Sequence, residues 1–337
     1  MRTLLIGSIM AVFASMTHAG EKAVLTLGTA TPGGGFALYG QALVGKIGAA
    51  DPSLTIELRA TKGSGENIPL LEAGHLDLAL IEGTIAQEVL DAAASRPARL
   101  SVVAAMYPSA GMFVVRADSP YRKIADLRGR RVVFGASNSG LVVLARYILD
   151  GLGMDMQKDF DGVLLESAKD GPPMVLDGNA AALWGGGVGW PGFVAVAAGP
   201  KGARFIGLET QDLARIQAKH PFLKTLTVPA GSYAGLGSDI VTVGAWSMIL
   251  ARPGLSNDIV YRFVRALYSE DRPGQRPPQL RETTARNTMA ALADMKMLHA
   301  GARRYLEEDD TLEVLGIVPA ESAQQALLAL RALQPSS

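Results

Sequence analysis

The stretch VLTLGTATPGGGFALYGQALVGKI (residues 24–47) is followed by LTIELRATKGSGENIPLLEAG (residues 54–74), and the two together decide the fold. Each places small, hydrogen-bonding residues where an expected strand leads into an expected helix. Exposed backbone N–H groups at a helix start carry a partial positive charge, so such a loop can hold an anion without any catalytic group. Two of these loops on neighbouring strands predict one wall of a small-molecule site.

Strands and helices alternate along the rest of the chain, which favours an α/β fold with largely parallel sheets. A length of 337 residues favours two domains. Turn-rich breaks at YPSAG (residues 107–111) and VPAGSYAGLGS (residues 228–238) suggest where the chain passes between them. We expect lobe 1 to comprise residues 20–107 and 238–337 and lobe 2 to comprise residues 112–230, with hinge crossings near 107–112 and 230–240.

Composition narrows the class of protein. Lys+Arg and Asp+Glu both total 32, and this balance argues against a nucleic-acid partner. Residues 1–19 form a short basic, then apolar, stretch that ends in Thr-His-Ala, which predicts a secretory signal peptide cut after Ala19 and a periplasmic location. A buried first strand or helix is the alternative. The absence of cysteine excludes a cysteine-linked lipid anchor and disulfides, and we expect a monomer held together by its cores.

Four patterns typical of catalytic, cofactor-binding or metal sites are incomplete in this sequence. GGGFALYG (residues 33–40) has Leu38 where a dinucleotide fingerprint needs its third glycine, and Gly45-Lys46 is not followed by the Ser or Thr of a P-loop. Ser64 and Ser139 do not complete the nucleophile motif G-x-S-x-G. The four histidines lack metal-ligand spacing. We therefore expect no enzyme activity, no cofactor and no metal.

Several stretches resemble one family. They are GTATPGGGFALYG, TKGSGENIPLLEAGHLDLALIEG, VVRADSPYRKIADLRGRRVVFGASNSG, HPFLKTLTVPAGSY and LHAGARRYLEE. In order and spacing they resemble the TAXI-type solute-binding proteins of TRAP transporters. The resemblance implies a type II periplasmic-binding-protein fold, in which two α/β lobes joined by a hinge close on a ligand, and delivery of that ligand to a sodium-coupled membrane permease.

The sequence also departs from the family pattern. Lys62 stands in a loop where many members have a second glycine, and Glu82-Gly83-Thr84 replaces Gln-Ser-Asp. Ser137-Asn138 replaces a proline–glycine pair, and the segment from Trp184 to Trp190 is unusually rich in glycine and tryptophan. These changes leave the expected fold intact and leave the ligand open, although Lys62 is the position where ligand choice is expected to lie.

The candidate ligand-binding residues lie in loops that precede expected helices or follow expected strands. They are Gly34, Gly35, Phe36, Tyr39, Thr61, Lys62, Gly63, Ser64, Asn67, Glu82, Thr84, Ser137, Asn138, Ser139, Gly140, Trp184 and Trp190. Most have a structural alternative. The glycines can serve only to turn the chain, Phe36 and Tyr39 can belong to the core, and Ser64 can be an N-cap. Lys62 can be a solvated surface lysine. Glu82 can pair with Lys62 or bind an amine of the ligand. Both tryptophans are expected in a loop, and their alternative role is packing against other side chains.

The expected function is capture of a small organic anion, a carboxylate or an amino acid such as a glutamate-like compound, for a TRAP-type permease. Two other classes stay open. A sensory module would report the ligand to a membrane partner, and an exported enzyme on the same fold would need a nucleophile–base pair that the sequence does not show.

Overall fold

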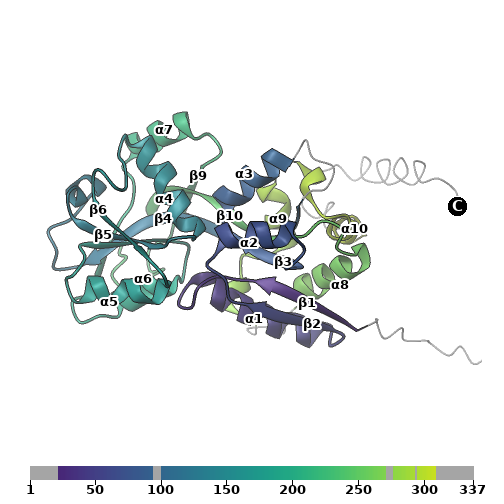
Figure 1. Cartoon of the computed structure of the whole chain (residues 1–337). Coiled ribbons are helices and arrows are strands. Elements are labelled where there is room, and N and C mark those ends of the chain that lie inside the picture. The colour runs from purple at the N-terminus through teal and green to yellow at the C-terminus, as the bar shows by residue number, and fades with distance from the viewer. Residues whose placement is uncertain (1–21, 94–99, 271–275, 293, 309–337) are drawn as a thin grey trace, which may run out of the picture.

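The computed structural model describes residues 22–93, 100–270, 276–292 and 294–308, and within these ranges the chain forms two α/β lobes side by side (Figure 1). The expected signal peptide at residues 1–19 lies outside the described residues. Within the described ranges, no helix combines the length and apolar character needed to cross a bilayer.

Lobe 1 opens with three strand–helix units. They are β1 (Ala23–Gly28), α1 (Gly35–Ala50), β2 (Leu54–Arg59), α2 (Ser64–Glu72), β3 (Leu78–Ile81) and α3 (Gly83–Ala93). Buried Tyr39, Leu43 and Ile47 recur every four residues along one face of α1, and this spacing makes the segment a helix packed on the sheet. The three strands are parallel in the order β2-β1-β3.

Lobe 2 repeats this order. Its elements are β5 (Arg131–Ala136), α4 (Gly140–Gly151), β6 (Asp161–Leu165), α5 (Gly171–Leu176), β7 (Ala182–Gly186), α6 (Pro191–Ala197), β8 (Ala203–Ile206), α7 (Thr210–Lys219) and β9 (Lys224–Val228). Strands β6, β5 and β7 are parallel in that order, so each lobe has its first strand between its second and third.

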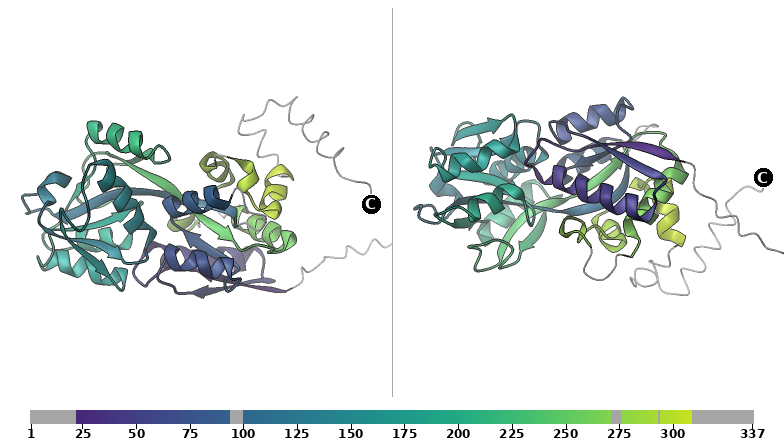
Figure 2. Two further views of the ribbon diagram at one scale, coloured as in Figure 1. Left: turned by 45° about the horizontal axis from the view of Figure 1, so that its top comes forward. Right: turned by 90° about the horizontal axis from the view of Figure 1, so that it is seen from below.

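Two long antiparallel strands join the lobes, and Figure 2 shows them from two further directions. They are β4 (Ser101–Arg116) and β10 (Ile240–Ala251). The chain then completes lobe 1 with α8 (Asn257–Tyr268), α9 (Ala285–Ala291) and α10 (Ala300–Glu308). Short 3₁₀ turns occupy Ile124–Leu127, Ala168–Asp170, Pro278–Leu280 and Met295–Met297.

The turn-rich break expected at residues 107–111 is wrong, because β4 continues through it as one strand. Pairing with β10 overrides the turn-forming composition: Pro108 lies opposite Trp246, where the register shifts, and a proline is tolerated at such an irregularity. Gly244 brings the strands close, since a Cβ there would lie 2.1 Å from the Ser109 carbonyl oxygen.

The buried side chains form separate hydrophobic cores on the two sides of the point where β4 and β10 join the lobes. One core draws on residues between Leu25 and Met106 and again between Met248 and Leu306. Two further cores draw on residues between Ala110 and Val243. The α/β fold class with two lobes, predicted from the alternation of strands and helices, is confirmed. The exact lobe boundaries stay a prediction.

Candidate functional site

Strand order places the candidate site at the border between the lobes. In an open parallel sheet, a crevice forms outside the carboxyl ends of the strands where the strand order reverses. In lobe 1 this point lies after β1, β2 and β3, and in lobe 2 after β5, β6 and β7. The two sets of strand ends face each other, so loops from both lobes converge on one space.

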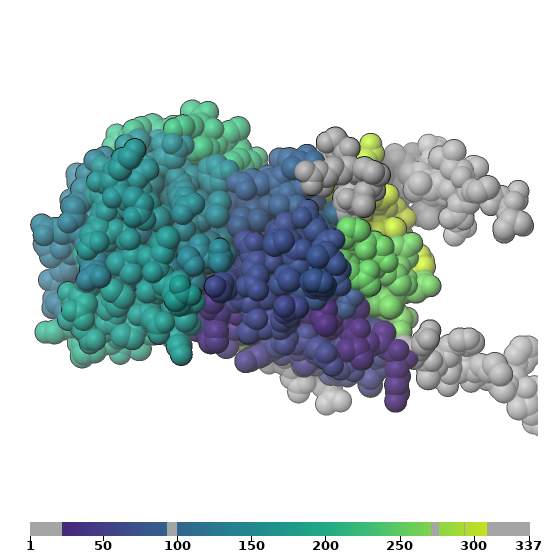
Figure 3. Space-filling view, in the orientation of Figure 1, coloured from purple at the N-terminus to yellow at the C-terminus, as the bar shows by residue number. Residues whose placement is uncertain are grey.

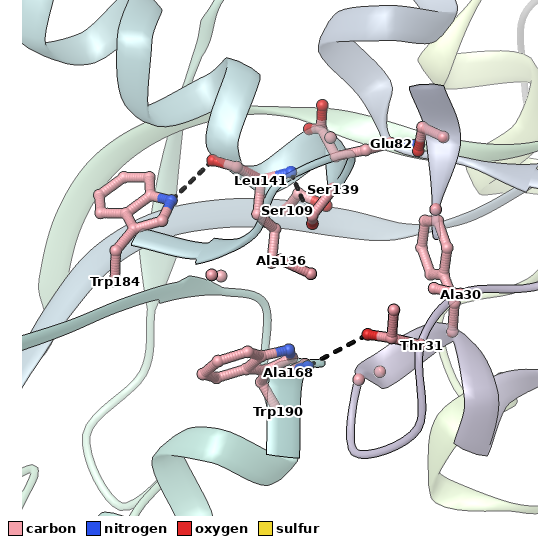
Figure 4. Close-up of a pocket in the computed structure, with 18 of the residues that line it drawn as sticks. Ala30, Thr31, Glu82, Ser109, Ala136, Ser139, Leu141, Ala168, Trp184 and Trp190 are labelled. Carbon is pink, nitrogen blue, oxygen red and sulfur yellow. Dashed lines mark hydrogen bonds between the residues drawn. The ribbon is translucent and has the colours of Figure 1, made fainter. Parts of the chain in front are cut away.

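That space is a small cavity of about 60 Å³, here called the inner cavity (Figure 4). It is lined by Ala30, Thr31, Gly34, Gly35, Phe36, Lys62, Gly63, Ser64, Glu82, Tyr107, Ser109, Phe134, Gly135, Ala136, Ser139, Gly140, Leu141, Ala168, Leu183, Trp184, Gly186 and Trp190. A buried water needs roughly 10–15 Å³ on this measure, so the inner cavity holds on the order of four or five water molecules.

The lobes touch around the inner cavity, and Figure 3 shows them in contact along their border. The Ala168 N–H donates to Thr31 Oγ1 at 3.2 Å, and the Ser167 hydroxyl donates to the Pro32 carbonyl at 3.1 Å. Elsewhere on the border, the Gly65 N–H donates to the Asn138 carbonyl at 3.1 Å. The structure therefore has closed lobes.

Three hydroxyl groups in the inner cavity share one hydrogen-bonding pattern. Ser64 Oγ accepts the Glu82 N–H at 3.0 Å, Ser139 Oγ accepts the Leu141 N–H at 3.3 Å, and Thr31 Oγ1 accepts the Ala168 N–H. A hydroxyl has one hydrogen to donate besides its acceptor lone pairs. Among the described residues, none of the three hydroxyls donates to another protein group. Their hydrogens are therefore left for an acceptor in the cavity.

The starts of helices add partial positive charge. Gly35 of α1, Ser64 of α2 and Gly140 of α4 are each the first residue of their helix, and all three line the inner cavity. Lys62 lies in the loop before α2 and also lines the cavity, although its side chain is largely exposed. The electrostatics of the inner cavity thus favour a negative group.

Glu82 is the acidic exception on the cavity wall. It is 2% exposed, and its Oε2 accepts the Thr84 N–H at 2.9 Å and the Thr84 hydroxyl. Its Oε1 is buried without a hydrogen-bond partner among the described residues. Burial raises the pKa of Glu82 to about 7, against the lowering effect of Thr84. Burial therefore favours the neutral, protonated form of this carboxyl more than in an exposed glutamate.

The two tryptophans play different structural parts. Trp184 belongs to β7, not to the expected loop, because its backbone pairs with Phe113 of β4. It is 1% exposed, and its indole N–H donates to the Leu141 carbonyl at 2.7 Å. Trp190 immediately precedes α6, and its indole N–H donates to no group among the described residues. Of these two side chains, Trp190 is therefore the one that keeps an indole N–H for a ligand.

Six predicted site residues do not line the inner cavity. Asn67 is fully buried, and its amide donates to the Thr29 and Leu80 carbonyls at 2.8 and 3.0 Å, which ties the ends of β1 and β3 together. Thr61 donates to the same Thr29 carbonyl at 3.1 Å. Thr84 is buried against Glu82. These three polar side chains hold the site's framework.

The other three of these six residues lie outside the lining of the inner cavity. Tyr39 packs in the core of lobe 1 with its hydroxyl 2.8 Å from Thr283 Oγ1, while Ser137 and Asn138 are exposed in the loop before α4. Ser64 is not an N-cap, because α2 begins at Ser64 itself and Gly63 precedes it.

The structure also brings in residues that the sequence did not suggest, among them Thr31, Tyr107, Ser109 and Ala168. Tyr107 and Ser109 were hidden by the misassigned break in β4. Ala168 lies in the loop after β6. This loop was predictable, because the carboxyl end of each parallel strand can contribute to the wall of the site. Within the described ranges, no cluster of His, Asp or Glu could hold a metal ion.

Two α/β lobes that close over a small cavity built from strand ends define a two-lobed fold with its candidate site at the lobe border. The model of the NMT1-like family matches residues 27–309, which is most of the chain. The chain therefore belongs to the NMT1-like family.

Solved structures with a similar arrangement include three binding proteins. The periplasmic aliphatic sulphonate binding protein SsuA from Escherichia coli is 16% identical, with 84% of this chain and 78% of that chain covered and a TM-score of 0.39. An arginine transport system periplasmic binding protein from Legionella pneumophila is 14% identical, with 73% and 92% covered and a TM-score of 0.44. The substrate binding protein of an amino acid ABC transporter is 14% identical, with 72% and 91% covered and a TM-score of 0.42. None of these likenesses identifies the ligand of this chain.

Proposed function

We propose that this protein is a periplasmic receptor for a small organic anion, a carboxylate or an amino acid such as a glutamate-like compound. It captures the anion by lobe closure, leaves it chemically unchanged and delivers it to a TRAP-type sodium-coupled permease. It does so as a monomer, after loss of a signal peptide at Ala19. The permease assignment rests on the resemblance of five sequence stretches to TAXI-type proteins.

One observation carries the choice of an anion. Thr31, Ser64 and Ser139 each use their hydroxyl oxygen to accept a backbone N–H, which directs their hydrogens to an acceptor. Hydrogen bonds to a charged acceptor stabilise a complex more than those between neutral groups. Because Thr31 and Ser64 belong to lobe 1 and Ser139 to lobe 2, an anion that accepts from all three favours the closed state.

A thermal-shift screen of carboxylates and amino acids tests the proposal. A ligand present at 100 times its Kd stabilises the folded protein by about 2.7 kcal/mol, which raises the Tm by on the order of 5 °C. We expect anionic compounds to produce this shift. If no anionic compound stabilises the protein, while native mass spectrometry finds a neutral or cationic molecule bound, the proposal is wrong.

Lys62→Ala tests the cationic loop. Because Lys62 is exposed, its attraction for a bound carboxylate is screened, and we expect about two- to fivefold weaker binding by isothermal titration calorimetry. Lys158→Ala is the matched control, since Lys158 is exposed and does not line the inner cavity. Lys46 is unsuitable as a control because it is buried and donates to the Ser269 carbonyl at 2.6 Å. Equal Kd values for the Lys62 and Lys158 variants would remove Lys62 from the site.

A further inference from the structure

A second space adjoins the inner cavity on the side of the strand crossing. This outer groove has a volume of about 680 Å³ and is formed by α1, the turn between β7 and α6, the loop after β9 and the segment around Pro278–Leu280. Gly35, Tyr107, Gly186 and Trp190 line both spaces. The inner cavity and the outer groove therefore meet at one wall, and two of its four residues are glycines without side chains to seal it.

The two volumes suit different parts of a molecule. Ligand pockets usually measure about 300–1,000 Å³. The inner cavity, at about 60 Å³, is well below that range and matches a group the size of a carboxylate, whereas the outer groove lies inside it. A ligand of ordinary size needs the groove as well as the cavity.

The lining of the outer groove mixes polar and apolar residues in nearly equal measure. Leu38 and Val188 are exposed large hydrophobic side chains, at 39% and 63%, and both line it together with Pro108. Its charged residues, Arg281 and Glu282, are neighbours of opposite sign and are both exposed, so they provide no net attraction for a second charge. Leu38 and Val188 therefore give the groove an exposed apolar contact that a hydrocarbon chain can cover.

We propose that the ligand is amphipathic: its anionic head occupies the inner cavity and an apolar tail extends past Trp190 into the outer groove. This inference rests on the proposed function and narrows its ligand class from small organic anions to anions with an apolar chain. It assigns the groove residues Leu38 and Val188 to tail recognition.

Straight-chain monocarboxylates from acetate to octanoate test the proposal by isothermal titration calorimetry on the whole protein. Each methylene that leaves water strengthens binding by about fourfold, and by about twofold where the open groove covers it partly. We therefore expect Kd to fall steadily as the chain lengthens beyond what the inner cavity holds.

Val188→Asp locates the tail. Val188 lies between Gly187 and Gly189, whose φ angles of 86° and 74° form the turn, so replacing its side chain leaves the turn intact. We expect octanoate to bind at least about fivefold more weakly to this variant and acetate to bind unchanged. Val194→Asp is the matched control, because Val194 is 49% exposed and lines neither space. Circular dichroism confirms that each variant is folded.

The outcomes separate this inference from the proposed function. Tighter binding of longer acids that is lost in Val188→Asp and kept in Val194→Asp supports both. If acetate and octanoate bind equally, or if Val188→Asp and Val194→Asp behave alike, the outer groove does not take the tail, although anion binding still stands. If no monocarboxylate of any length binds while the thermal-shift screen finds another anion, this inference falls and the proposed function stands. If no anionic compound binds, both fall.

Discussion

Gly140 controls how closely the lobes approach. It is the first residue of α4 in lobe 2, and it packs directly on Glu82 of lobe 1. A Cβ at Gly140 would lie 2.2 Å from Glu82 Cβ, 3.0 Å from Glu82 Cγ and 3.1 Å from Ser64 Oγ. Ordinary contacts of this kind span 3.4–4 Å. Gly140→Ala should therefore keep the lobes from reaching the closed arrangement.

The size of the effect follows from the overlap. The lobes must separate by at least 1.2 Å, the difference between 3.4 and 2.2 Å, to make room for the methyl group. Forcing a methyl group into a packed contact costs about 1–3 kcal/mol. The closed population should fall by about 5- to 150-fold, and the affinity of any ligand that requires closure should fall with it. The fold itself should not suffer, because alanine suits a helix better than glycine by about 0.5–1 kcal/mol.

A cross-lobe disulfide measures closure without a known ligand. The chain contains no cysteine, so Gly65→Cys with Asn138→Cys introduces a single pair. A Cβ at Gly65 would lie 3.6 Å from Asn138 Cβ, within the range of roughly 3.5–4.5 Å found in disulfides. The pair should therefore cross-link in the closed state, and Gly140→Ala in the same background should slow this reaction by the factor given above.

Gly45→Ala is the control, since Gly45 also lies in a helix and a Cβ there has nothing within 4 Å. It should cross-link like the parent pair. If the Gly140 and Gly45 variants cross-link at the same rate, Gly140 does not limit closure and the steric argument is refuted.

Two further predictions concern buried groups. Burial raises the pKa of Glu82 from 4.5 to about 7, so the folded state binds this proton more tightly than the unfolded chain does. The contribution of the bound proton to the free energy of unfolding is complete below about pH 4.5 and is lost as the pH rises toward 7. Urea unfolding should show the wild type losing stability against Glu82→Gln across this window, and parallel pH profiles would contradict it. Trp184→Phe should lower the unfolding free energy by about 1–3 kcal/mol, because the indole hydrogen bond to the Leu141 carbonyl is lost and the smaller ring packs less well against Phe113. Trp190→Phe breaks no indole hydrogen bond among the described residues, so it should cost less stability than Trp184→Phe although its ring packs against Phe193, and it should weaken ligand binding. Equal urea midpoints for the two tryptophan variants would refute the distinction.

Elements with a strong local pattern could be predicted from the sequence. The four-residue spacing of Tyr39, Leu43 and Ile47 predicts α1, and Leu54 and Ile56 alternate with polar residues as β2 requires. Residues 107–111 could not be assigned in this way, because their turn-forming composition is overridden by pairing with β10, more than 130 residues away.

The candidate site was predictable only in part. Loops next to glycine-rich helix starts drew attention to Gly34, Gly35, Gly63 and Gly140, all of which line the inner cavity. The sequence could not separate Trp184 from Trp190, since the difference is whether a distant carbonyl accepts the indole N–H. It also could not show that Asn67 ties β1 to β3 instead of facing the cavity.

The sequence by itself determined the α/β class, the two lobes and the loops at the strand ends, because these follow from hydrophobic periodicity and from the conformations that glycine allows. Tertiary structure alone decided which of those loops meet. Thr31 and Ala168 are 137 residues apart in the chain and joined by one hydrogen bond. It also decided that the glycine-rich loops of residues 24–74 form only part of the inner cavity, and that this cavity shares a wall with a larger groove. Such juxtapositions depend on how two separately packed cores close on each other, and no local pattern encodes that distance.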